Sequence, residues 1–168
     1  MSEGSTTLKN ILFVCTGNTC RSPLAEGIAK KLFLHGKRKN YNVGSAGSAA
    51  VDGVPASPLA VEVANANAID LTKHQARFLS RTLVSDADLI IALAASHRDT
   101  VGVIEPPALA YTYLLTDFCD DVEGDVRDPI GMGCEVYEES FALMAKCIEK
   151  MQDKLDAFDG WKNPDTAK

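Results

Sequence analysis

A short apolar run that leads directly into a cysteine-containing loop is the feature that most constrains the fold of this chain. Residues 11–14 read Ile-Leu-Phe-Val, a continuous run of β-forming residues typical of strands that are covered on both faces. The run passes into Cys15–Ser22 (Cys-Thr-Gly-Asn-Thr-Cys-Arg-Ser), and Pro23 follows. Because proline favours the first helical position and apolar residues then recur at helical spacing, the sequence predicts a strand, a tight loop and a helix.

The alternation of strands and helices continues along the chain. Residues 41–46 and 88–93 are predicted strands, residues 108–115 a weaker one, and a helix is predicted from Ser57 to about Asn67. Apolar residues spaced by four and three predict the last helix, and they are Tyr137, Phe141, Met144, Ile148, Met151, Leu155 and Phe158. We therefore expect an α/β fold: a single-domain, four-stranded, mainly parallel sheet with helices on both faces, in the doubly wound, flavodoxin-like manner.

The length and charge of the chain narrow the possible partners. The 168 residues fit one domain at 9–160, between a disordered N-terminal tail (1–8) and a C-terminal tail (161–168). A net charge of −6 argues against nucleic-acid and anionic-membrane partners.

No apolar run approaches the roughly 20 residues that cross a bilayer, and the odd number of cysteines, five, argues against a disulfide framework. A reducing cytoplasm is the expected location.

The loop after the first strand has the chemistry of an anion site. Backbone N–H groups in such a turn converge at the positive end of the following helix, which suits a dianionic phosphate. Arg21 would add a planar fork of donors, and the same field is expected to lower the pKa of Cys15. Ser22 can donate a hydrogen bond to the sulfur. The residues expected to bind the phosphate are Thr16, Gly17, Asn18, Thr19, Cys20, Arg21 and Ser22.

Two further loop residues fit this interpretation through their backbone properties. Gly17 allows the backbone to approach closely, and Asn18 tolerates left-handed backbone angles. The alternative to a catalytic role for Cys15 is that it is a buried structural cysteine in an ordinary turn. The agreement of the strand, the spacing, the Arg-Ser pair and the following proline favours Cys15 as a nucleophile.

At this point the chain resembles a known family. Cys15–Ser22 is similar to the phosphate-binding loop of low-molecular-weight protein tyrosine phosphatases. The similarity extends to Ser-Ala-Gly at 45–47, to the third strand and to Asp-Pro at 128–129, and it covers almost the whole chain. It implies a hydrolase that acts on a phosphorylated protein or peptide and uses no metal or other cofactor.

The resemblance also implies roles for individual residues. Cys15 would be the nucleophile that forms a phosphocysteine intermediate, and Arg21 would hold the phosphoryl group. Asp128 would protonate the leaving group and then activate the hydrolytic water, as a carboxyl group beside an anion site can do. The residues alone do not distinguish Asp128 from its acidic neighbours, which otherwise indicate a solvated loop and match no calcium loop. These neighbours are Asp117, Asp120, Asp121, Glu123 and Asp125.

The substrate residue is predicted from two positions. The loop with threonine at position 19 resembles that of the bacterial protein arginine phosphatase branch, whereas tyrosine phosphatases of the family carry a larger aliphatic residue there. A hydroxyl at Thr19 could hydrogen-bond to a guanidinium or orient water. Ile130 stands where tyrosine-specific members have an aromatic residue. Phosphoarginine is therefore the first expectation and phosphotyrosine the alternative.

Supporting roles are expected for a few more side chains. Ser22, Ser45 and His74 would support the loop, the last by resemblance to relatives. Cys20 could form a disulfide with Cys15 that protects the nucleophile from irreversible oxidation, or could simply be a small packing residue. The remaining histidines, His35 and His97, are expected to be exposed, and the remaining cysteines, Cys119, Cys134 and Cys147, to be plain thiols.

Two other classes of protein remain open. Thioredoxin-coupled arsenate reductases resemble this loop, and arsenate-type anions fit the same site as phosphate. Those enzymes relay a disulfide through two cysteines a few residues apart, whereas Cys119 and Cys134 are far apart and Cys134 follows the Asp-Pro pair. A non-catalytic phosphate-binding module would need neither a nucleophile nor an acid, whereas this sequence has a candidate for each, Cys15 and Asp128.

Overall fold

A parallel sheet of four strands forms the centre of the molecule. The computed structural model describes residues 7–38 and 40–166. The strands are β1 (Lys9–Cys15), β2 (Tyr41–Gly47), β3 (Leu89–Ala92) and β4 (Thr112–Leu114). Their order is β2-β1-β3-β4, and every neighbouring pair is parallel. The predicted α/β class and the four-stranded parallel sheet are confirmed.

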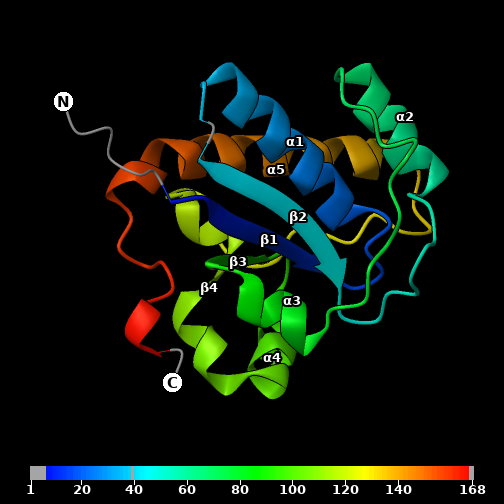
Figure 1. Ribbon diagram of the computed structural model, residues 1–168. Coiled ribbons are helices and arrows are strands. Elements are labelled where there is room, and N and C mark those ends of the chain that lie inside the picture. Colours follow the sequence, from blue (N-terminus) through cyan, green and yellow to red (C-terminus); the bar gives the residue numbers. More distant parts are fainter. Residues whose placement is uncertain (1–6, 39, 167–168) are drawn as a thin grey trace.

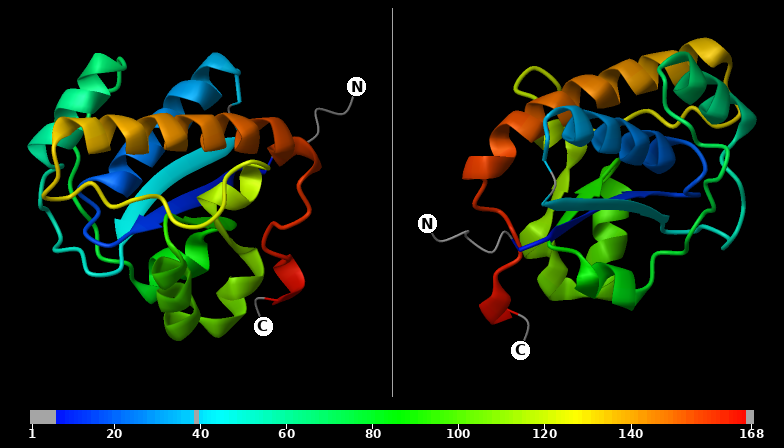
Figure 2. Two further views of the ribbon diagram at one scale, coloured as in Figure 1. Left: turned by 180° about the vertical axis from the view of Figure 1, so that it is seen from behind. Right: turned by 45° about the horizontal axis from the view of Figure 1, so that its top comes forward.

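Helices cover both faces of this sheet (Figures 1 and 2). The α-helices are α1 (Arg21–His35), α2 (Pro58–Ala66), α3 (Arg81–Asp86), α4 (Ala95–Ile104) and α5 (Cys134–Lys154). Short 3₁₀ helices are η1 (Pro106–Tyr111), η2 (Leu115–Phe118), η3 (Leu155–Ala157) and η4 (Pro164–Thr166). Helices α1 and α5 lie on one face with α2 against α5, and α3 and α4 lie on the other.

The sheet separates two hydrophobic layers because alternate side chains of a strand point to opposite faces. Ile11 and Phe13 of β1 pack in the larger layer with α1 and α5. Leu12 and Val14 pack in the smaller layer with residues of α3 and α4. Both faces of β1 are therefore buried, which explains the unbroken apolar run in the sequence.

Two element boundaries differ from the prediction, and two helices lie where none was predicted. The fourth strand covers only Thr112–Leu114, because the segment before it begins with two prolines and winds into η1. Helix α1 begins at Arg21, so Pro23 is its third residue rather than its first. Helices α3 (81–86) and α4 (95–104) were not predicted.

The segment after the last helix returns to the start of the sheet. Trp161 stacks on Tyr41 with a centroid distance of 5.8 Å, and the Lys9 ammonium lies 5.4 Å from the Trp161 ring centroid. The backbone N–H of Lys162 donates to the Asp88 carbonyl at 2.8 Å. The first two residues of the predicted tail 161–168 thus contact the domain. Residues 1–6 of the predicted N-terminal tail lie outside the described residues.

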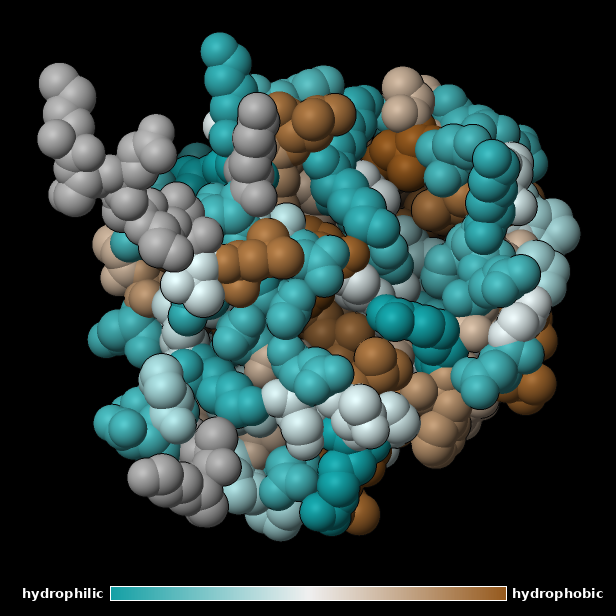
Figure 3. Space-filling view, in the orientation of Figure 1, coloured by the Kyte–Doolittle hydropathy of each residue, from teal (hydrophilic) through white to brown (hydrophobic). Residues whose placement is uncertain are grey.

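The surface in Figure 3 is mainly hydrophilic, with hydrophobic residues in separate areas. Within residues 7–38 and 40–166, no helix has the length and apolar character needed to cross a membrane.

Candidate active site

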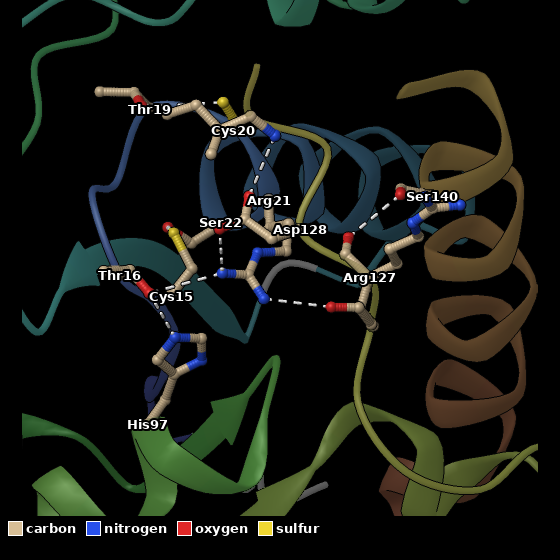
Figure 4. Close-up of polar contacts among 12 residues, drawn as sticks. Cys15, Thr16, Thr19, Cys20, Arg21, Ser22, His97, Arg127, Asp128 and Ser140 are labelled. Atoms are coloured by element: carbon tan, nitrogen blue, oxygen red, sulfur yellow. Dashed lines mark hydrogen bonds and ion pairs between the residues drawn. The ribbon is translucent and has the colours of Figure 1, made fainter. Parts of the chain in front are cut away.

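The predicted anion loop lies at the carboxyl edge of the sheet (Figure 4). Cys15 is the last residue of β1 and Arg21 the first of α1, so the loop turns between a strand end and a helix start. The Cys15 sulfur lies 2.8 Å from Ser22 Oγ. Backbone N–H groups of Asn18 and Ser22 also hydrogen-bond to the sulfur. The loop therefore directs several donors at one point, as an anion site requires.

The thiol of Cys15 is almost fully buried, and this corrects one expectation. Burial has the largest influence and raises the pKa of Cys15, because a thiolate loses its hydration there. Hydrogen bonds from Ser22 and Asn18 and the charge of Arg21 act in the opposite direction. The predicted lowering of the pKa by the loop is therefore present but outweighed by burial.

Asn18 holds the loop in shape from within. Its φ of 54° places it in the left-handed region that the sequence indicated. Its side-chain amide donates to Ser22 Oγ at 2.7 Å and to Ser45 Oγ at 3.0 Å, and its Oδ1 accepts from the backbone N–H of Arg77 at 2.8 Å. Every polar atom of this buried side chain thus has a partner.

A second set of contacts supports the loop from outside. His74 Nε2 lies 2.7 Å from the carbonyl oxygen of Asn18, which is the position expected for a bracing histidine. Ser45 Oγ donates to the Glu26 carboxylate, and the Arg77 guanidinium donates to the Ser45 carbonyl at 3.0 and 3.2 Å. Sequence reasoning missed Glu26 and Arg77, since both act through contacts with residues distant in the chain.

The close backbone approach in the loop occurs at Gly47 rather than at Gly17. A Cβ on Gly47 would lie 2.4 Å from the Thr16 carbonyl oxygen and 2.8 Å from the Asn18 nitrogen. A Cβ on Gly17 would meet only Thr19 Oγ1, at an ordinary 3.5 Å. The glycine at the end of β2 is therefore what lets the loop pack against the sheet edge.

Asp128 reaches the loop from the segment before α5. Its Oδ2 forms an ion pair with Arg21 Nη2 at 3.1 Å, and its Oδ1 accepts from the backbone N–H of Ile130 at 3.1 Å. Arg21 Nη1 donates to the Val126 carbonyl at 3.1 Å. The side chain of Arg21 is 6% exposed and that of Asp128 43%, so the carboxylate lies at the mouth of the site. Cys15, Arg21 and Asp128 are thus brought together (Figure 4).

The other acidic residues of this segment have different positions. Asp125 Oδ1 accepts from the backbone N–H of Ala95 at 2.8 Å, and Ser140 Oγ donates to the Arg127 carbonyl at 3.2 Å, so the segment is anchored just before Asp128. Asp120 and Asp121 form exposed ion pairs with lysines of α5. In the part of the chain that the structure describes, no cluster of His, Cys, Asp and Glu could hold a metal ion.

His97 is a residue of the site that the sequence did not indicate. It was expected to be exposed, but the first turn of α4 places it 2% exposed with Nε2 2.8 Å from Thr16 Oγ1. Burial and the neighbouring Arg21 charge lower the pKa of His97 to about 4. No local pattern could have identified it, because its environment is made by loops distant in sequence. His35 is exposed, as predicted.

The two predicted specificity residues differ in exposure. Thr19 is half-buried and its carbonyl accepts from the backbone N–H of Ser57 at 2.9 Å. Ile130 is 59% exposed. Cys20 is buried, with its sulfur 3.2 Å from Ser57 Oγ and 3.3 Å from Tyr137 Oη. All five cysteines are free thiols in this structure.

A cysteine in an anion-binding loop at the carboxyl edge of a parallel sheet, faced by an arginine and an aspartate, is the arrangement of a cysteine-dependent phosphatase. Residues 10–158 match the family described as low molecular weight phosphotyrosine protein phosphatase. The chain belongs to this family and is a cysteine-dependent protein phosphatase.

Relatives with two different substrate residues are similar to the chain. A protein-arginine-phosphatase of Geobacillus stearothermophilus is 34% identical over 86% of this chain and 95% of its own. The crystal structure of a low molecular weight protein tyrosine phosphatase from T. tengcongensis is 39% identical, with a TM-score of 0.82 over 87% of this chain and 99% of that one. A YwlE arginine phosphatase mutant, in which a cysteine is replaced by a phosphorylated active-site serine, is 30% identical, with a TM-score of 0.83 over 89% and 97%.

Proposed function

We propose that this protein hydrolyses phosphoarginine in proteins through a phosphocysteine intermediate on Cys15. The observation that carries the choice of substrate is the threonine at position 19, a half-buried residue of the phosphate-binding loop. A hydroxyl there can accept a hydrogen bond from a guanidinium, which carries only donors. Relatives of both kinds are similar to the chain, and the protein-arginine-phosphatase of Geobacillus stearothermophilus is one of them.

In the first step the proton of the Cys15 thiol moves to the Asp128 carboxylate by way of water, and the resulting thiolate attacks phosphorus. The S–P bond forms as the P–N bond breaks, and the leaving nitrogen takes the proton of Asp128, which becomes a carboxylate. The loop N–H groups and Arg21 stabilise the charge on the phosphoryl oxygens. The phosphorylated serine that replaces a cysteine in the YwlE mutant supports a covalent step at this position.

In the second step water releases the phosphate. The Asp128 carboxylate removes a proton from the water as its oxygen bonds to phosphorus, and the S–P bond breaks. The thiolate that leaves is stabilised by Ser22, whose Oγ lies 2.8 Å from the sulfur. Asp128 and Cys15 then regain the protonation states in which they began, so the cycle closes without a metal or cofactor.

The proposal is tested by kcat/KM on one peptide that carries phosphoarginine and on the same peptide with phosphotyrosine. We expect wild type to prefer phosphoarginine and Thr19→Ile to reduce that preference by about tenfold or more, because the site loses its hydroxyl. Ser96→Ala, an exposed change on α4, serves as the control. A wild-type preference for phosphotyrosine that Thr19→Ile leaves unchanged would assign the chain to the tyrosine phosphatases instead.

Cys15→Ser separates the phosphatase from the other classes. The variant is expected to lose turnover while it still binds inorganic phosphate, because the N–H cradle and Arg21 remain. Turnover near the wild-type rate would contradict the nucleophilic role. Thioredoxin-dependent reduction of arsenate by wild type would instead support the arsenate reductase alternative.

A further inference from the structure

His97 is a buried histidine with one partner on the catalytic loop. Its Nε2 lies 2.8 Å from Thr16 Oγ1, while its Nδ1 is buried with no hydrogen-bond partner among the described residues. Thr16 itself is exposed at the mouth of the loop. Its Oγ1 also accepts from Arg21 Nη2 at 3.4 Å. A single threonine hydroxyl therefore connects a buried imidazole to the guanidinium of the phosphate site (Figure 4).

The unpartnered nitrogen indicates which tautomer His97 adopts. Among backbone groups a buried N–H without a partner is rarer than a buried carbonyl without one, and we expect the imidazole to follow the same preference. The proton is therefore on Nε2, which donates to Thr16 Oγ1, and Nδ1 is a buried acceptor without a partner among the described residues. A second proton would create both an orphaned donor and a charge close to Arg21, with only Asp125 and Asp128 to offset it. The imidazole is accordingly neutral.

This tautomer determines the direction of the Thr16 hydroxyl. A hydroxyl oxygen accepts at two lone pairs, and here His97 and Arg21 occupy both. The proton of Thr16 must then point away from both donors, toward the open mouth of the loop. Arg21 stabilises the phosphoryl group in the proposed mechanism. Its Nη2 contacts Thr16 Oγ1 and, at 3.1 Å, Asp128 Oδ2, so a phosphoryl oxygen that replaces Asp128 on Nη2 would lie beside Thr16 Oγ1.

We infer that His97 is a positioning residue: it orients the Thr16 hydroxyl so that its oxygen supports Arg21 and its proton is donated to a phosphoryl oxygen of the substrate. The inference rests on the proposed role of the loop and adds one donor to it. Thr16 is the group that touches the substrate, and His97 acts through it.

A double-mutant cycle tests the inference with p-nitrophenyl phosphate as substrate and inorganic phosphate as competitive inhibitor. Thr16→Val is expected to lower kcat/KM about tenfold and to raise the phosphate inhibition constant by about the same factor. His97→Leu should have an effect of about fivefold on both, and none of note in the Thr16→Val background. His97→Gln, which places a donor close to Nε2, should restore most of the loss. Additive losses, or an unchanged phosphate inhibition constant, would overturn the inference.

The controls separate this inference from the proposed function. His35→Leu, an exposed histidine at the end of α1, should leave both constants unchanged. Because the substrate is an aryl phosphate, the result does not depend on a preference for phosphoarginine. Turnover by Cys15→Ser would contradict the mechanism, whereas additive losses with an inactive Cys15→Ser would contradict only the role of His97.

Nitrogen-15 NMR of wild type provides a readout that needs no variant to fold. The inference expects the His97 ring at neutral pH to carry its proton on Nε2, with Nδ1 bare. A spectrum with the proton on Nδ1, or on both nitrogens, would overturn it.

Discussion

At the scale of single residues, two opposite influences meet at the Cys15 sulfur. Burial raises the pKa of the thiol, and the hydrogen bond from Ser22 lowers it. Ser22→Ala removes the lowering influence, so the pKa of Cys15 should rise further and the thiolate should form at higher pH. The rate of iodoacetamide labelling at Cys15, followed by mass spectrometry over a pH series, should therefore shift to higher pH.

The exposed Ser96→Ala variant is the matched control and should label at the wild-type pH. A shift of the Ser22→Ala profile to lower pH would contradict the role of Ser22 in stabilising the thiolate.

How far single residues could be predicted depends on whether their partners are local. The loop from Cys15 to Ser22 acts through its own backbone, and Asn18, a residue type that tolerates left-handed backbone angles, adopts them. His97 and Arg77 contact the loop across 81 and 59 positions of sequence, respectively. Such contacts follow from the packing of the sheet, which residue type does not encode.

At the scale of elements, the segment between η2 and α5 brings the candidate acid to the nucleophile. Asp128 is a partly exposed residue of this segment, paired with Arg21. Asp128→Asn removes the transferable proton, so kcat should fall most for substrates with poor leaving groups, on the order of 10²–10⁴-fold. The measurement is kcat across a series of aryl phosphates with leaving groups of increasing pKa.

Asp120→Asn, on the same segment but in an exposed ion pair with Lys154, is the matched control and should have little effect. Equal losses across the whole series for Asp128→Asn would argue against an acid role.

Element boundaries were predicted best where burial alone determines the structure. Strand β1 and helix α5 have strong apolar patterns, and both were found close to the expected positions. Strand β4 was predicted too long because η1 takes up the first half of its apolar residues. Helix α4 starts without a side-chain cap, and Asp125 from the distant acidic segment binds its first N–H. The sequence around α4 gives no indication of the contact with Asp125, which is 30 positions away.

At the scale of the whole molecule, the larger hydrophobic layer joins the sheet to α1 and α5. Met144 of α5 is fully buried in this layer. Met144→Ala should lower the free energy of unfolding by about 2–5 kcal/mol, because the side chain leaves a cavity that the packed helices fill only in part. Urea denaturation measures the loss, with the exposed Lys150→Ala as control. A loss below about 0.5 kcal/mol for Met144→Ala, the range of surface changes, would contradict this packing.

The order of the strands is the part of the architecture that the sequence could not provide. Alternating strands and helices predicted a parallel sheet, but several orders satisfy that pattern. The observed order puts β1 in the interior of the sheet, between β2 and β3. Cys15 therefore ends a strand with neighbours on both sides, and Gly47 of β2 can pack against its loop.

The stacking of Trp161 on Tyr41 has a practical consequence for handling this enzyme. Tyr41 and Lys9 begin strands β2 and β1, whereas Cys15 ends β1, roughly 20 Å away along the strand. Both ends of the described chain therefore leave the domain at the edge opposite the catalytic loop. A fluorescent label or a surface tether attached at this edge, beside Lys9 or Trp161, would therefore lie far from the approach of a bulky phosphoprotein to Cys15.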